Sequence, residues 1–140
     1  MKLNDEVTNI QPIKLATARQ DGLEKPGRNL TVAGWGTTSE GGNISDRMRE
    51  VSVPVVSDAR AQSACGPRSY FPKLMVAAGA KDIDSCQGDS GGPLFKPSVP
   101  RTQVGIVSFG NGCARAGFPG VYTEVNSSGI RSFIVDAAQR

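Results

Sequence analysis

The sequence predicts a mostly β fold built from short strands and tight turns. Gly and Pro account for 17 and 9 of the 140 residues, which favours many turns over a helical bundle. Val alternates with Ser and Pro over residues 51–55, as in a half-buried strand. With 38% hydrophobic and 21% charged residues, the chain has the composition of one globular domain with a real core.

The N-terminal segment, residues 1–28, shows no steady hydrophobic period. It mixes Asn, Gln, Pro and Asp with isolated Leu and Ile, as an extended connector with little core of its own does. We therefore predict a connector over residues 1–28, a β domain over residues 29–125 and a helix over residues 126–140.

Two strands begin the β domain. The first covers residues 30–33, Leu-Thr-Val-Ala, and the second covers residues 51–55, in which Val alternates with Ser and Pro. Because Pro54 has no backbone N–H, we expect the second strand at a sheet edge. The Gly, Ser and Thr residues of segment 37–45 predict a surface loop between the two strands.

One short helix and three more strands are predicted downstream. Ser57 and Asp58 form a capping pair, and the Ala residues that follow indicate a helix within residues 57–69. Further strands are predicted over residues 74–78, 103–109 and 119–125. The middle one runs Val-Gly-Ile-Val without alternation, as a strand buried on both faces does.

The last segment is predicted to be helical. Its apolar residues share the spacing i, i+3, i+4, i+7 and i+8, which places them in a single stripe. These residues are Ile130, Phe133, Ile134, Ala137 and Ala138.

The charge pattern argues against two classes of partner. The net charge of +3 comes from scattered Lys and Arg without a basic run or interleaved aromatics, so we expect no nucleic-acid binding. No apolar run approaches the roughly 20 residues that span a bilayer, so we expect no membrane insertion. The N-terminus is polar, which predicts no signal peptide in this chain.

Three cysteines, Cys65, Cys86 and Cys113, are too few and too widely spaced for a metal cage, and the chain has no His. We expect no metal and no cofactor. One disulfide and one free thiol are predicted instead, and a structural disulfide indicates an oxidising compartment. The disulfide and the polar N-terminus are compatible if the chain is the C-terminal piece of a longer exported protein.

The segment 84–94 reads Asp-Ser-Cys-Gln-Gly-Asp-Ser-Gly-Gly-Pro-Leu and has the character of a nucleophile site. A Ser hydroxyl is a poor nucleophile unless a base takes its proton, and that base is most often an imidazole. Since the chain contains 0 His, it cannot supply this base itself.

The chain resembles the C-terminal half of a trypsin-like serine protease of the chymotrypsin fold. The resemblance covers nearly the whole chain in the family's order and spacing. The segments that carry it are Gly-Trp-Gly at 34–36, residues 84–94, Gly-Ile-Val-Ser-Phe-Gly at 105–110, Gly-Cys at 112–113 and Pro-Gly-Val-Tyr at 119–122. It implies an all-β fold, an antiparallel six-stranded Greek-key barrel followed by a C-terminal α-helix.

The resemblance implies a role for three neighbouring residues. Ser90 matches the catalytic nucleophile, and the N–H groups of Gly88 and Ser90 match the oxyanion hole. Asp89 matches the activation carboxylate, which receives the new N-terminal ammonium after zymogen cleavage.

The resemblance also implies a substrate pocket formed by Asp84, Ser108, Gly110 and Gly120. A slot with Gly walls and a carboxylate at its base admits Lys or Arg, so the parent protein is expected to cut peptide or protein substrates after these residues. Cys86 and Cys113 match a disulfide that joins the two pocket segments.

Departures from the family pattern carry further expectations. Ala77 stands where the partner of Cys65 is common, so Cys65 is expected to be free. Leu30 and Lys96 stand where many relatives have another bridge. Residues 1–3 resemble those just after the catalytic Asp, so the first barrel with the His and Asp is expected upstream, as a partner in cis or in trans.

The predicted function is therefore that of a secreted serine endopeptidase whose present chain is catalytically incomplete alone. Two alternatives remain open at this point. The first is a non-catalytic binding module, a pseudoprotease on the same scaffold. The second is one half of a split enzyme that a separate chain completes.

Overall fold

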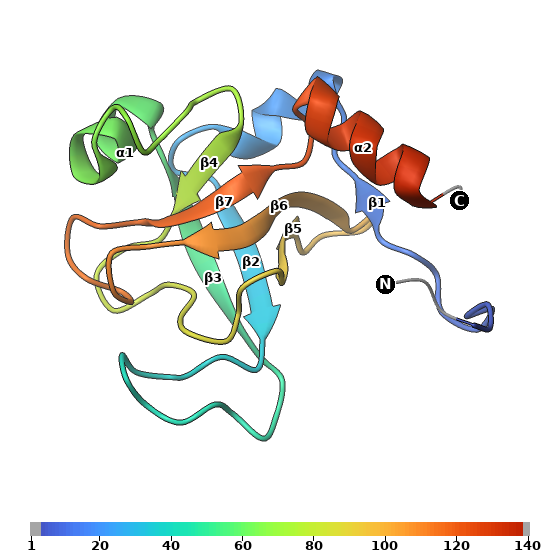
Figure 1. The fold of residues 1–140 in the computed structure, drawn as a ribbon, viewed down its shortest axis with the longest axis horizontal. Helices are drawn as coiled ribbons and strands as arrows, with labels where there is room; N and C mark the ends of the chain where they lie inside the picture. The colour runs from blue at the N-terminus through green and yellow to red at the C-terminus, as the bar shows by residue number, and fades with distance from the viewer. Residues whose placement is uncertain (1–3, 139–140) are drawn as a thin grey trace.

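Six antiparallel strands close into a barrel in the computed structural model, which describes residues 4–138 (Figure 1). The barrel strands are β2 Asn29–Gly34, β3 Arg49–Val56, β4 Met75–Ala78, β5 Pro93–Lys96, β6 Thr102–Phe109 and β7 Gly120–Glu124. The order β6-β5-β2-β3-β4-β7 closes because β6 also pairs with β7. Helix α2, Ser128–Ala138, follows the barrel. The predicted all-β barrel with a C-terminal helix is confirmed.

Strand β3 lies inside the ring, so the prediction of an edge strand is wrong. It pairs with β2 along residues 49–54 and with β4 at Val55 and Val56. Pro54 is tolerated because it lies one residue outside the β3–β4 ladder. Its carbonyl accepts a hydrogen bond from the N–H of Gly79 at 2.9 Å, so the strand stays joined to the segment after β4 although Pro54 has no N–H to donate.

The connector predicted over residues 1–28 contains regular structure and contributes to the core. Strand β1, Lys14–Leu15, pairs in parallel with β6, and the 3₁₀ helix η1, Ala18–Glu24, follows it. Ala16 is buried, and Leu23 packs against the barrel core. Both elements are too short to show a hydrophobic period, which is why the sequence pattern did not indicate them.

The short helix predicted within residues 57–69 is present as α1, Asp58–Cys65. The side chain of Ser57 accepts a hydrogen bond from the N–H of Arg60 at 3.4 Å, as an N-cap residue does. The helix ends before Gly66, whose φ of +87° lies in the region that L-residues avoid.

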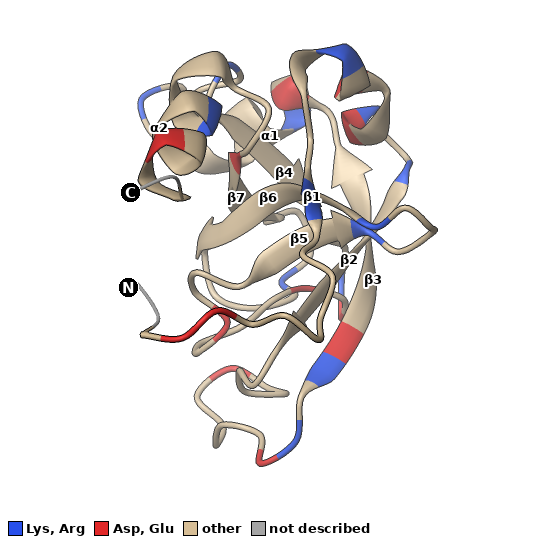
Figure 2. Ribbon diagram, turned by 90° about the vertical axis from the view of Figure 1, so that its right-hand side faces the viewer, with Lys and Arg blue, Asp and Glu red and all other residues tan. Residues whose placement is uncertain are grey.

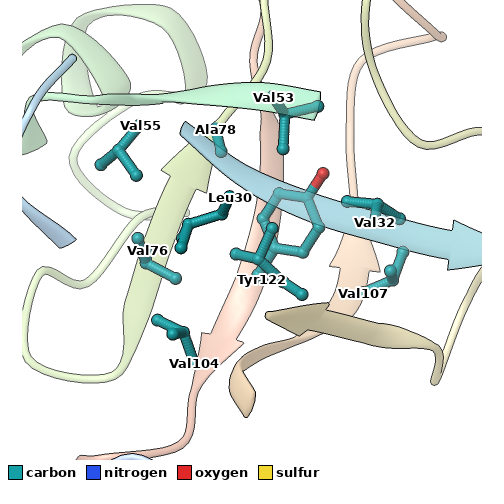
Figure 3. Close-up of a cluster of buried hydrophobic side chains, with 10 residues drawn as sticks. Leu30, Val32, Val53, Val55, Val76, Ala78, Val104, Val107 and Tyr122 are labelled. Carbon is teal, nitrogen blue, oxygen red and sulfur yellow. The ribbon is translucent and has the colours of Figure 1, made fainter. Parts of the chain in front are cut away.

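The barrel interior is filled by aliphatic side chains around Tyr122 (Figure 3). The buried cluster comprises Leu30, Val32, Val53, Val55, Val76, Ala78, Leu94, Val104, Val107 and Tyr122. Gly105 makes room for Tyr122 and Leu94, because a Cβ there would lie 3.0 Å from the Cβ of Tyr122 and 3.2 Å from a methyl carbon of Leu94. The Tyr122 hydroxyl lies 3.2 Å from the Ser85 hydroxyl, so the one polar atom of the side chain reaches the loop between β4 and β5.

Charged residues of both signs are interspersed over the helices and loops in the view of Figure 2. Within residues 4–138, no helix is long and apolar enough to cross a membrane.

Two acidic side chains lie close together where the end of η1 approaches the end of β7. They are Glu24 and Glu124, and the Oε1 atom of Glu24 is buried without a hydrogen-bond partner among the described residues. Burial, followed by the charge of Glu124, raises the pKa of Glu24 from its ordinary 4.5 to about 8. The amide of Asn126 donates to Asp21 at 3.2 Å and fastens the same junction.

Replacement of Leu94 by Ala is expected to lower the free energy of unfolding by about 2–5 kcal/mol, because the side chain is 0% exposed and leaves a cavity. Chemical denaturation of the two proteins measures the difference. Val99→Ala is the matched control, since Val99 is 89% exposed and its truncation should change little. Equal effects of the two substitutions would contradict the packing described for β5.

Stability is expected to fall as the pH rises from about 4.5 to about 8, because the folded state holds the Glu24 proton more tightly than the unfolded state. Glu24→Gln should flatten this dependence, since the carboxamide does not titrate. Denaturation midpoints at pH 5 and pH 8.5 provide the measurement. The exposed Glu50→Gln variant serves as control and should retain the wild-type slope. An unchanged slope in Glu24→Gln counts against the raised pKa of Glu24.

Candidate functional site

The five residues predicted for substrate binding and attack line one cavity of about 210 Å³. They are Asp84, Ser90, Ser108, Gly110 and Gly120. Three separate segments supply them: the loop between β4 and β5, the end of β6, and the start of β7 (Figure 1). This cavity is called the slot below.

Asp84 is held in the slot by backbone donors. Its Oδ1 accepts from the N–H of Ser85 at 2.8 Å, and its Oδ2 accepts from the N–H of Ala114 at 3.2 Å. Burial raises the pKa of Asp84, while these backbone hydrogen bonds oppose the rise. The carboxylate is thus oriented without a cation bound to it among residues 4–138.

One wall residue of the slot, Gly120, is a glycine because Asp84 leaves no room for a side chain there. A Cβ on Gly120 would collide with Oδ1 of Asp84. A Cβ on Gly110 would lie 3.8 Å from Gly120 Cα, so the two wall residues are near neighbours. Side chains at these two positions would fill the cavity that the backbone leaves open.

A disulfide joins Cys86 to Cys113 across the slot, with their Cα atoms 5.2 Å apart. It links the loop that carries Asp84 and Ser90 to the connection between β6 and β7. In the chain-entropy account, a bridge over this separation of 27 residues stabilises the fold by about 3.5 kcal/mol. Cys65 is free, as expected, and burial raises the pKa of its thiol.

A tight turn presents the exposed Ser90. The N–H of Gly91 donates to the carbonyl of Val107, and the N–H of Val107 donates to the carbonyl of Gly92, both at 2.9 Å. These bonds fix the turn to β6. Within the described part of the chain, the N–H groups of Gly88 and Ser90 donate no hydrogen bond.

Gly88 occupies a position that only glycine suits. Its φ is +96°, and a Cβ there would lie 3.2 Å from the Cα of Gly36. Gly88 itself does not line the slot.

Asp89 points away from the slot into a backbone cradle. Its Oδ1 accepts from the N–H of Gly36 at 2.8 Å, and its Oδ2 accepts from the N–H of Cys86 at 3.0 Å. A Cβ on Gly34 or Gly36 would overlap the carboxylate. Sequence reasoning assigned these two glycines to the family pattern but gave them no role. The Gly-Trp-Gly motif at residues 34–36 was the sequence signal that could have indicated this role.

Residues 4–138 contain no group of three or more His, Cys, Asp or Glu side chains arranged to hold a metal ion.

Comparison with known proteins identifies relatives of this chain. The family model "Trypsin" matches residues 1–132. Trypsin-1 of Astacus astacus is 48% identical over 132 residues, which cover 90% of this chain and 54% of that protein. Trypsin of Saccharopolyspora erythraea is 45% identical over 118 residues, covering 83% and 49% of the two chains. Trypsin alpha-3 of Lucilia cuprina is 43% identical over 132 residues, covering 94% and 74%.

The chain spans about half the length of the first two of these relatives. The extent and identity of the matches agree with the closed barrel and with the segments that suggested the family. The chain belongs to the trypsin family of serine proteases.

Proposed function

We propose that the parent protein of this chain is a serine endopeptidase that hydrolyses peptide bonds after Arg or Lys. The observation that carries the proposal is that Asp84 and Ser90 line the same glycine-walled slot. A long cationic side chain that enters the slot can pair with the Asp84 carboxylate. The peptide carbonyl that follows this side chain then lies near the Ser90 hydroxyl.

The proposed reaction is acyl transfer through Ser90. The Ser90 hydroxyl attacks the carbonyl carbon while a base accepts its proton, and the same base returns the proton to the leaving amine. The N–H groups of Gly88 and Ser90 stabilise the oxyanion, a role supported by their lack of other acceptors among residues 4–138. Water then hydrolyses the acyl-enzyme by the reverse proton movements.

The base is proposed to be a His on polypeptide outside these residues, since the sequence contains 0 His. Loss of the His from such a unit costs about a million-fold in turnover. The chain alone is therefore proposed to be catalytically incomplete. Its partner is a first barrel that carries the His and the Asp, supplied in cis or in trans.

An apolar hollow on the surface of this chain supports the proposal that the first barrel docks there. Its volume is about 1230 Å³, and Ile13, Pro93, Phe95 and Val99 contribute to its lining together with Gly91, next to Ser90. Ile13 and Val99 are 38% and 89% exposed. Apolar surface of this kind beside a reaction site is typical of a protein contact.

Asp89 is proposed to be the activation carboxylate. Its cradle supplies two backbone donors and no cation from residues 4–138, so a new N-terminal ammonium is a suitable partner. The disulfide between Cys86 and Cys113 supports secretion of the parent protein into an oxidising compartment.

Benzamidine is expected to bind the slot of the purified chain, because its amidinium mimics the Arg head group. Asp84→Asn should weaken this binding by about 2–5 kcal/mol, since it removes one partner of a desolvated charge pair. Competition with fluorescent p-aminobenzamidine measures the change. Asp46→Asn is the control, because Asp46 is exposed and lies outside the slot. Equal affinity of the Asp84→Asn and wild-type chains would reject the specificity assignment.

Fluorophosphonate labelling tests the reaction itself. The chain alone is expected to label poorly, and its mixture or co-expression with a His-bearing first barrel is expected to label at Ser90. Peptide mapping by mass spectrometry identifies the labelled residue, and Ser90→Ala is the negative control. Efficient labelling of the isolated chain is incompatible with a base supplied from outside it. No labelling with any first barrel, together with retained benzamidine binding, would favour a pseudoprotease.

A further inference from the structure

A second hollow, of about 460 Å³, lies between the start of α1, the turn after β4 and the connection from β6 to β7. None of its lining residues lines the slot. These segments gather on one side of the barrel in Figure 1. The volume falls within the range of about 300–1,000 Å³ that is common for small-molecule sites.

The charged side chains of this hollow are all cationic. Arg60, Lys81 and Arg115 line it, and no Asp or Glu of the described chain does. Arg115 is already paired with Glu40, through Nε at 3.0 Å and through a terminal nitrogen at 2.6 Å. Arg60 and Lys81 form no ion pair within residues 4–138, so two cations remain available to a ligand.

The acids that neighbour these cations in sequence are directed elsewhere. Asp58 accepts a hydrogen bond from the Tyr70 hydroxyl at 2.7 Å and lines a different hollow, next to Glu24. Asp82 lines the hollow that contains Asp89. Neither carboxylate forms an ion pair with Arg60 or Lys81 within residues 4–138, so these two cations are not neutralised by their neighbours in sequence.

The remaining lining is largely apolar. Pro54, Val55, Phe118 and Pro119 contribute carbon surface, and the Ser57 hydroxyl adds a polar group beside Arg60. Two free cations are too few for a nucleic-acid or polysaccharide track, and they suit one anionic group. A ligand must therefore combine a small apolar body with one acidic head.

We propose that this hollow binds an organic anion in which an aromatic or aliphatic body carries a sulfate, sulfonate or carboxylate group. The body packs on Phe118 and the prolines. The Arg60 guanidinium can hold two oxygens of the head group, and the Lys81 ammonium adds a second charge.

Titration of the 140-residue chain with naphthalene-2-sulfonate, followed by calorimetry and by amide chemical shifts, tests this proposal. Saturable one-to-one binding is expected, with the largest shifts at Ala80, Lys81 and Gly117. Naphthalene-2-sulfonamide has the same ring without the charge and should bind at least about tenfold more weakly, which corresponds to about 1.4 kcal/mol.

Charge variants locate the site. Lys81→Glu and Arg60→Glu should each weaken sulfonate binding about tenfold or more, and the milder Lys81→Gln should weaken it less. Arg68→Glu makes the same charge change at an exposed residue outside the hollow and should leave binding unchanged. Thermal unfolding of each variant establishes that the barrel is intact.

Four results would overturn the assignment. The first is equal binding of the sulfonate and the sulfonamide. The second is equal weakening by Arg68→Glu and Lys81→Glu. The third is a set of shifts centred on the slot or on the Ile13 and Val99 surface. Binding of a sulfated polysaccharide without any response to naphthalene-2-sulfonate would also contradict it, since it would indicate a diffuse basic surface.

Discussion

The pairing of β6 with both β5 and β7 is the constraint on which the rest of the structure depends. It closes the ring of strands and leaves no free barrel edge. It also brings together the three segments that line the slot. The loop before β5 carries Asp84 and Ser90, the end of β6 leads into Gly110, and β7 begins at Gly120. Two backbone bonds of Val107 then hold the Ser90 turn against β6. The slot is therefore a consequence of barrel closure and is not a property of any one segment.

The partly buried acids of this chain are accommodated in two different ways. Asp84 and Asp89 accept hydrogen bonds from backbone N–H groups, which orient the carboxylates without committing a Lys or Arg of the described chain. Glu24 and Glu124 instead lie close together at the junction of η1 and β7, where burial and the charge of Glu124 raise the pKa of Glu24. The first arrangement leaves a carboxylate open to an external cation, whereas the second makes the junction sensitive to pH.

Local patterns predicted the elements that have their own sequence signal. The alternating Val residues of β3, the Ser57 cap of α1 and the apolar stripe of α2 each led to the correct element. The edge-strand prediction for β3 was wrong because the missing N–H of Pro54 was taken to require a free sheet edge. In the structure, Pro54 lies just outside the β3–β4 ladder. Elements β1 and η1 were missed because they are held by contacts with β6 and the core, which local periodicity does not record.

The sequence by itself determined the chemical inventory: a Ser among glycines, an Asp six positions before it, three Cys and no His. It also pointed to the family, because several motifs occur in one order and spacing. Only the tertiary structure decided that Asp84, Gly110 and Gly120 line one cavity, that Gly34 and Gly36 enclose Asp89, and that Glu24 meets Glu124. These contacts join residues far apart in the chain. They arise from the closure and packing of the whole barrel, which the conformational preferences of single segments do not contain.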